Sequence, residues 1–350
     1  MKKSIFIALF SVVFSTFLFA ENQDTVVAIS QPTLAPEINR TPQFRGVLRT
    51  RFEYDLNDDQ AHFNVRNARV VMAGRVTERI GYQMQVDLSA NGAFQILDLE
   101  VRMNPTENLS LRIGQGIIPF YHLHMIAPSQ VLFAERALAC RFMTGHLRDV
   151  GIIADYRLSA GNVPIVFSGA LFSGAGINNP QWRNLSDFGY AFRVMIGSFD
   201  NARLSLRTHH STIANDVRNR LYAIDFRYFN NGFAVDAELI HRNLIPLSGS
   251  RDSRLGWCVQ ASKIFRTERQ IINYIQPAVR WDMMTAEHGS WSDANRLTLG
   301  LNFGFNQTYR RTQLKLNYEL FFVNEETAEF YFGNPRHSHD RLVLELRLNF

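Results

Sequence analysis

Apolar and polar residues alternate along most of the chain, and the pattern is clearest in its final segment. One face of an extended chain there holds Leu342, Leu344, Leu346, Leu348 and Phe350. The other face holds Glu345, Arg347 and Asn349. Because successive side chains of a β-strand point to opposite faces, a strand that separates lipid from water must alternate in this way. The segment therefore predicts a membrane-spanning strand.

About sixteen segments show this pattern, each with roughly the ten residues that a tilted strand needs to cross a bilayer. We expect strands to begin near Phe44, Asn64, Gly81, Gln95, Leu109, Asp149, Pro164, Phe188, Asn201, Leu221, Phe233, Arg254, Tyr274, Arg296, Thr312 and Arg341. The even-numbered connections are mostly short, as at Ser198–Asp200, and the odd-numbered ones are mostly longer and polar, as at Asn324–Asp340. Single-chain barrels pair short periplasmic turns with longer outer loops. The sequence therefore predicts an all-β fold, a transmembrane antiparallel β-barrel with both chain ends in the periplasm.

The amino-terminal residues indicate export. Lys2 and Lys3 precede an apolar run from Ile5 to Phe19, and Ala20 is a small residue before the chain turns polar. That order is typical of a secretory signal peptide, and the run is a little short for a spanning helix. We expect a signal peptide at 1–20, a periplasmic lead-in at 21–43 and a bacterial outer-membrane barrel at 44–350.

Composition excludes several other classes. Aromatic residues make up 12% of the chain and charged residues 20%, which fits neither a disordered tail nor a helical inner-membrane protein. The net charge is +5, and only Lys263 and Lys315 remain as lysines once the signal peptide is removed. So small an excess does not indicate a nucleic-acid partner, and we expect outer-membrane lipids and small solutes instead. In a secreted soluble β-protein, nothing would require short connections at one end of the strands and long ones at the other.

The longest connection, Gly116–Arg148, follows the fifth strand. Loops of that size within a compact fold are usually functional or disordered. This one is rich in apolar residues, and Ser129–Phe142 begins like a helix, with Ser129 as the cap and Glu135 in an early turn. We expect this third outer loop to fold toward the lumen and narrow it. Packing of the loop over the barrel mouth is the alternative.

Charged residues on the polar face of the strands are expected to line the lumen. The basic ones are Arg49, Arg51, Arg69, Arg75, Arg112, Arg193, Arg203, Arg207, Arg227 and Arg280. The acidic ones are Glu53, Asp87, Asp98, Glu100, Asp225, Asp236, Glu238, Asp282, Glu319 and Glu345. Arginines crowd the first five strands, and rings of arginine favour anions. We therefore expect the solute-binding residues of the constriction to be Arg69, Arg112, Arg136 and Arg141. The alternative is that each arginine pairs across strands and only holds the wall.

The second to seventh expected strands resemble the family of phosphate-selective porins O and P. The resemblance is carried by Arg66–Arg69, Tyr82–Asp87, Arg112–Gln115 and Glu135–Ala139. It implies a sixteen-stranded barrel, commonly trimeric, with an inward third loop that helps to filter anions. The chain departs from the family before Pro119. The family tends to have a basic residue before this proline, whereas here Gly116, Ile117 and Ile118 precede it. A lysine-based phosphate path is therefore not carried over.

Other chemical motifs are weaker. His122 and His124 could ligate a metal, but no neighbouring Cys or second His pair completes a site, so we expect no metal and no cofactor. His210 and Ser211 are adjacent in sequence at the outer end of a strand, which does not supply a nucleophile with an oriented base. A disulfide between Cys140 and Cys258 would pin the third loop to the wall.

The sequence thus predicts a porin, not an enzyme, with no catalytic residues. It would let small hydrophilic solutes diffuse passively and would prefer anions, with phosphate one of them. The alternative function is a structural or adhesion barrel with a closed lumen, whose outer loops bind a partner.

Overall fold

Sixteen long antiparallel strands form the wall of the described part of the chain. The computed structural model describes residues 40–90, 92–120, 131–143, 148–174, 176–177, 188–213, 217–246, 251–269, 271–286, 293–305 and 311–350. All of them belong to one compact unit, Asn39–Phe350. The expected signal peptide, and the expected lead-in up to residue 39, lie outside the described residues. Among those residues, no helix is both long and apolar enough to cross a membrane.

The strand boundaries lie close to the expected ones. The strands of the first half are β1 (Gln43–Asp55), β2 (Gln60–Arg75), β3 (Ile80–Ala90), β4 (Ala93–Met103), β5 (Leu109–Ile117), β6 (Arg148–Ala160), β7 (Val163–Phe172) and β8 (Gly189–Gly197). Those of the second half are β9 (Ala202–Ile213), β10 (Val217–Asn230), β11 (Phe233–Ile245), β12 (Asp252–Lys263), β14 (Tyr274–Ala286), β15 (Ala294–Gly304), β16 (Thr312–Phe322) and β17 (Arg341–Asn349). The two-residue β13 (Phe265–Arg266) extends the pairing of β12 with β14. The expected sixteen-stranded barrel is confirmed.

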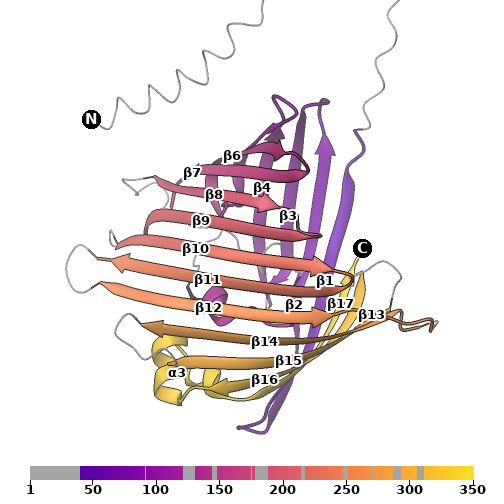
Figure 1. Ribbon diagram of the computed structural model, residues 1–350, viewed down its shortest axis with the longest axis vertical. Helices are drawn as coiled ribbons and strands as arrows, with labels where there is room; N and C mark the ends of the chain where they lie inside the picture. Colours follow the sequence, from indigo (N-terminus) through magenta and orange to yellow (C-terminus); the bar gives the residue numbers. More distant parts are fainter. Residues whose placement is uncertain are drawn as a thin grey trace, which may run out of the picture. The chain divides into compact units, whose positions relative to one another are not determined.

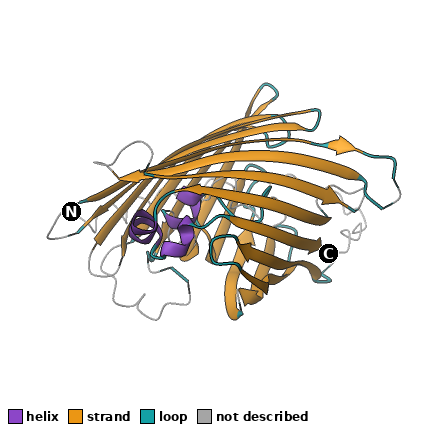
Figure 2. Ribbon diagram, turned by 90° about the horizontal axis from the view of Figure 1, so that it is seen from below, coloured by secondary structure: helices purple, strands orange, loops and turns teal. Residues whose placement is uncertain are grey.

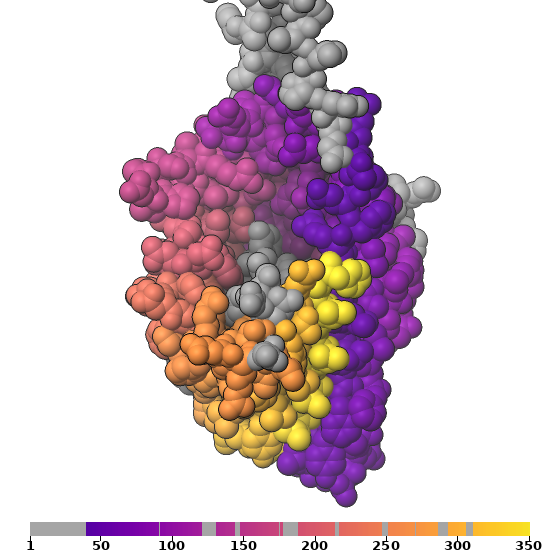
Figure 3. All heavy atoms as spheres, turned by 90° about the vertical axis from the view of Figure 1, so that its right-hand side faces the viewer, coloured from indigo at the N-terminus to yellow at the C-terminus, as the bar shows by residue number. Residues whose placement is uncertain are grey.

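The barrel closes because β1 pairs with β17, from Val47 opposite Asn349 to Asp55 opposite Arg341. Each of the remaining long strands pairs with the long strands before and after it in the chain (Figure 1). In the space-filling view the colours run round the ring in chain order, and the indigo and yellow ends meet (Figure 3). Closure removes the open edges that would otherwise leave backbone groups without partners in lipid.

Alternating burial shows which face of the wall is apolar. Along β17, Leu344, Leu346 and Leu348 are 37%, 47% and 40% exposed, whereas Glu345 and Arg347 are fully buried. Exposed leucines on the outer face and charged residues on the inner face are the pattern of a barrel in lipid. The interior is therefore polar, as the alternation predicted.

The third outer loop enters the barrel, but its predicted helix is mostly wrong. Ser129 lies outside the described residues, 131–137 follow an irregular path, and α2 covers only Leu138–Phe142. It packs against β12 and β14 on the inner side of the sheet (Figure 2). The carbonyl groups of 131–136 accept hydrogen bonds from wall side chains, and these tertiary contacts override the local helix signal.

The last outer loop carries a helix that the sequence did not predict. The helix α3 (Glu325–Phe332) is capped by Asn324, whose side chain accepts a hydrogen bond from the backbone N–H of Thr327 at 2.7 Å. It ends at Gly333, which has a φ of 68°, and a short 3₁₀ turn, η5 (Pro335–Ser338), follows. Figure 1 shows α3 beside the arrowhead of β14.

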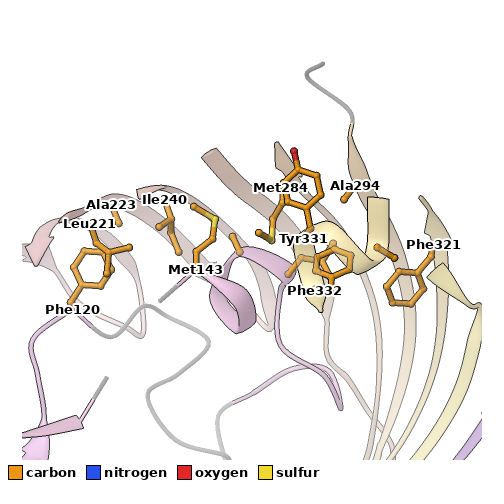
Figure 4. Packing of buried hydrophobic residues seen from close by; sticks show 13 residues of the cluster. Phe120, Met143, Leu221, Ala223, Ile240, Met284, Ala294, Phe321, Tyr331 and Phe332 are labelled. Carbon is orange, nitrogen blue, oxygen red and sulfur yellow. The ribbon is translucent and has the colours of Figure 1, made fainter. Parts of the chain in front are cut away.

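A hydrophobic cluster joins both inward elements to the wall. Its buried members are Phe120, Leu138, Ala139, Met143, Leu221, Ala223, Ile240, Met284, Ala294, Phe321, Ala328, Tyr331 and Phe332. Figure 4 shows Met143 beside the wall residue Ile240, and Tyr331 and Phe332 beside Met284. The cluster thus fixes α2 and α3 to one side of the lumen, from β10 to β16.

Candidate functional site

The segment Val131–Arg136 is held to the wall by hydrogen bonds to its own backbone. The Lys315 amino group donates to the carbonyl of Val131 at 2.7 Å and to that of Phe133 at 3.3 Å. The Arg280 guanidinium donates to the carbonyl of Glu135 at 2.9 Å. Each donor is a buried cation on the inner face of a strand, so each bond is charge-assisted and stronger than a neutral one.

Two neighbouring arginines of β1 hold the middle of the segment. Both Arg49 and Arg51 donate to the carbonyl of Ala134, Arg49 at 2.8 Å. Arg51 also pairs with Glu135, and both arginines pair with Glu345 of β17, at 2.6 and 2.7 Å. The segment is therefore anchored to the wall on the side of β1 and β14–β17.

Close backbone approach requires small residues on the wall. A Cβ placed on Gly256 of β12 would lie 2.4 Å from the Cβ of Ala139 and 2.9 Å from the Sδ of Met143. A Cβ on Gly300 of β15 would lie 2.8 Å from the ring of Phe133. Both glycines therefore open space for the inward loop.

A cavity of about 180 Å³ lies between this segment and the wall of β1–β4. It is lined by Arg49, Arg51, Arg66, Asn67, Arg69, Ala90, Gln95, Val131, Ala134, Glu135 and Arg136. Five of these side chains are arginines and one is a carboxylate. Such a lining can attract and orient small anions within the lumen.

The ion pairs around the cavity leave its positive charge in excess. Arg69 pairs with Asp87 at 2.8 Å, and Arg51 pairs with Glu135 and Glu345. Among the described residues, neither Arg66 nor Arg136 forms an ion pair within 4.0 Å, and Glu135 attracts both without pairing with them. These two guanidinium groups therefore remain available to a solute.

Glu135 compensates for only part of this charge, because it is a single carboxylate among five arginines. Burial by itself raises the pKa of its carboxyl group, but Arg51, Arg141 and Arg66 hold that pKa well below its usual value. The carboxylate thus stays ionised and committed to its arginine partners. Burial also lowers the pKa of Arg136, the direction expected for a cation that is removed from water.

The structure brings together two of the four residues expected at the constriction. Arg69 and Arg136 line the cavity. Arg112 does not, and lies 3.4 Å from Asp155 and 3.8 Å from Glu100. Arg141 lies 3.2 Å from Glu135 and packs over the ring of Phe142.

The sequence alternation missed Arg66, because a β-bulge moves it to the lumen. The register of β1 with β2 shifts between Arg49 and Thr50, so that Arg49 faces Asn67 and Thr50 faces Val65. Arg66 falls in the extra position, and bulges re-aim side chains in this way. As a result Arg66, Asn67 and Arg69 all line the cavity. The family motif at Arg66–Arg69 was the signal that could have identified it.

Elsewhere in the wall, lumen arginines pair with carboxylates of neighbouring strands, which is the alternative considered from the sequence. Arg203 pairs with Asp225 at 2.7 Å, and Arg207 pairs with Glu238 at 2.6 Å. Arg227 pairs with Asp236 at 2.7 Å. These buried cross-strand pairs compensate charge locally, so they leave less net field for a solute than the cavity does.

The cysteines and His210, which the sequence offered as further candidates, have packing contacts in the structure. Cys140 and Cys258 pack together with Ala137 in a buried cluster, and both are thiols in the structure. His210 stacks on Tyr190 with 4.8 Å between ring centroids, and His122 and His124 lie outside the described residues.

Asp55, Asp58 and His339 form a cluster of the kind that can bind a cation. They bring ligand-type atoms within 4.8 Å of one another. Asp55 already accepts the backbone N–H groups of Asn57 and Asp58, and its carboxylate lies 2.9 Å from Nδ1 of His339. The cluster therefore joins the first outer turn to the last outer loop.

The closed wall, the polar lumen and the inward third loop define an outer-membrane porin, which is a channel. Solved porins share this fold. The OmpF porin of Salmonella typhi, in complex with daunomycin, is similar with a TM-score of 0.66 and 14% identity, over 89% of this chain and 98% of that one. An anion-selective porin from Comamonas acidovorans gives a TM-score of 0.62 and 12% identity, over 89% and 100%. The trimer form of OmpT from Vibrio cholerae gives 0.59 and 12%, over 89% and 99%.

The family match is more specific. Residues 45–203 match the family model of phosphate-selective porin O and P, which confirms the resemblance over the strands that carried it. No curated protein sequence matches the chain significantly. The protein is thus a porin of the bacterial outer membrane, and the similarity to porin O and P extends over its residues 45–203.

Proposed function

We propose that the protein lets small hydrophilic anions diffuse passively across the outer membrane through the passage beside Val131–Arg136. The cavity with five arginines and one committed carboxylate carries this proposal. The anion-selective porin of similar fold supports it. Arg66 and Arg136 are the proposed solute contacts, with Arg69 oriented by Asp87 beside them.

Phosphate is one anion that this lining can bind, because a guanidinium group forms two parallel hydrogen bonds to phosphate oxygens. The same geometry serves carboxylates. The proposal therefore covers small oxyanions as a class.

Charge-removing variants test the proposal. Arg66→Gln combined with Arg136→Gln should lower the anion-to-cation permeability ratio several-fold in planar bilayers, because both cations line the cavity and neither belongs to an ion pair within 4.0 Å among the described residues. Arg112→Gln is the matched control, since Glu100 and Asp155 keep Arg102 and Arg193 as partners. An unchanged ratio in the double variant would refute the assigned site. A closed barrel, the alternative function, would show no conductance in any variant.

We further propose a homotrimer, as the family resemblance implies and as the trimer form of OmpT illustrates. Mass measurement by light scattering of the detergent-solubilised protein should give three chains per particle. A single chain per particle would contradict the trimer without affecting the proposed pathway, which lies within one barrel.

A further inference from the structure

A basic and aromatic patch lies on the outer face of the barrel, at the outer ends of β8–β12. Outward positions below it are apolar: Ile224 faces Leu206 on one side and Leu239 on the other. Two residues farther toward the outer end, Tyr222 faces Thr208 and His241. The face therefore changes from the hydrocarbon level to the headgroup level along β10.

A row of four neighbouring rings marks the boundary between the two levels. Tyr190 and His210 lie 4.8 Å apart between ring centroids, His210 and Tyr222 lie 5.4 Å apart, and Tyr222 and His241 lie 6.5 Å apart. The row crosses β8, β9, β10 and β11. Aromatic girdles of barrels lie where acyl chains meet headgroups.

Arginines occupy the positions above this row. Arg220 faces His210 across β9 and Asn243 across β11, and Arg218 lies two residues farther out on the same face. Two residues of a strand span about 7 Å, so both guanidinium groups start at headgroup height. Arg251 donates to the side-chain oxygen of Asn243 at 3.0 and 2.5 Å, which brings a third cation beside Arg220.

Within the described residues the three cations form no ion pair within 4.0 Å, and Asp252, which follows Arg251 in the chain, pairs with Arg254 at 3.1 Å. The outward positions of β9, β10 and β11 that the structure describes contain no carboxylate. Three neighbouring positive charges beside lipid repel one another, and an anion between them would relieve that repulsion.

We propose that this patch binds the phosphate groups of a glycolipid in the outer leaflet. Arg218, Arg220 and Arg251 contact the phosphates, since guanidinium groups match phosphate oxygens in pairs. The row from Tyr190 to His241 lies against the sugar and the upper acyl chains. Because the patch is on the lipid side of the wall, it is separate from the solute pathway in the lumen.

Retention of lipid A in native mass spectrometry tests the proposal on the full chain. The probes are bisphosphorylated lipid A, dephosphorylated lipid A and inorganic phosphate. Arg220→Gln combined with Arg251→Gln should weaken binding of bisphosphorylated lipid A about ten- to a hundredfold, because each of the two arginines near the membrane surface strengthens the binding of anionic lipid about fivefold. Lys263→Gln, at the other end of β12, is the control and should bind like the parent.

Each outcome decides the proposal. Binding that depends on the lipid phosphates, falls in the double variant and resists inorganic phosphate supports it. Equal binding by parent and double variant overturns it, as does an equal loss in Lys263→Gln. Displacement of the lipid by inorganic phosphate would also overturn it, because the patch would then bind free anions. Folding of each variant is verified by the heat-dependent shift in gel mobility, and Arg220→Lys, which keeps the charge, should retain most of the binding.

Discussion

Replacing Lys315 by methionine should loosen the inward segment without unfolding the barrel. Lys315 is fully buried and donates to the carbonyls of Val131 and Phe133. Methionine fills a similar volume but has no donor. Glu345, which lies 3.6 Å from the lysine, keeps Arg49 and Arg51 as partners, so no isolated buried carboxylate results.

The magnitude follows from the two lost hydrogen bonds. A hydrogen bond that involves a charged group contributes about 1.5–3 kcal/mol, and the longer of these two is the weaker. We therefore expect local opening of the segment to become easier by about 2–4 kcal/mol. Since 1.4 kcal/mol corresponds to a tenfold change, the opened population should rise about thirtyfold to several-hundredfold.

Two assays detect this opening. Single-channel recordings should show more current noise and a weaker anion preference, because the arginine-lined passage is no longer held in one geometry. Protease cleavage within 131–143 should become faster by about the same factor as the opened population. The control is Lys263→Met, which removes the other lysine of the barrel, whose amino group donates to the carbonyl of Asn231. Parent-like noise and cleavage in the Lys315 variant would refute the anchoring role.

Three further predictions concern the same loops. Gly256→Ala should destabilise the packing of α2 by about 1–3 kcal/mol, measured by thermal unfolding, because the new Cβ would lie 2.4 Å from that of Ala139. Gly169→Ala is the control and should leave thermal unfolding unchanged, because its Cβ would lie at an ordinary 3.6 Å from the ring of Phe192. Cys140 and Cys258 are buried thiols and should be inert toward N-ethylmaleimide in the parent, whereas Cys140 should be labelled faster in the Lys315 variant as the loop opens; equal labelling of the two proteins would contradict the anchoring by Lys315. Burial, Arg141 and Arg341 lower the pKa of His337 to about 4, so the unfolded loop, with an ordinary pKa of about 6.5, binds the proton more readily. Packing of α3 and η5 should therefore be at full strength above about pH 6.5, weaken as the pH falls and reach its minimum below about pH 4; hydrogen exchange of 325–338 should show this change, and His337→Gln should remove it.

The barrel itself was predictable because its signal is local. A period of two needs only neighbouring residues, and β17 shows it over its whole length. The expected start of β10 at Leu221 was four residues late because Arg218 and Arg220 face outward and break the apolar parity. The same pair of outward arginines supports the proposed lipid site.

The site was only partly predictable because long-range contacts determine it. Arg66 reaches the cavity through a bulge that appears only in the pairing of β1 with β2. The path of Val131–Arg136 depends on donors as distant in sequence as Lys315 and Arg347. No local pattern around Ser129 encodes those partners, so the helix signal there was misleading.

The zero-current potential of the parent protein in a salt gradient tests the central claim most directly. With potassium chloride more concentrated on one side of a planar bilayer, a passage lined by Arg66, Arg69 and Arg136 should admit chloride in preference to potassium. The dilute side should then become negative relative to the concentrated side. A dilute side that becomes positive would show cation preference and contradict the account.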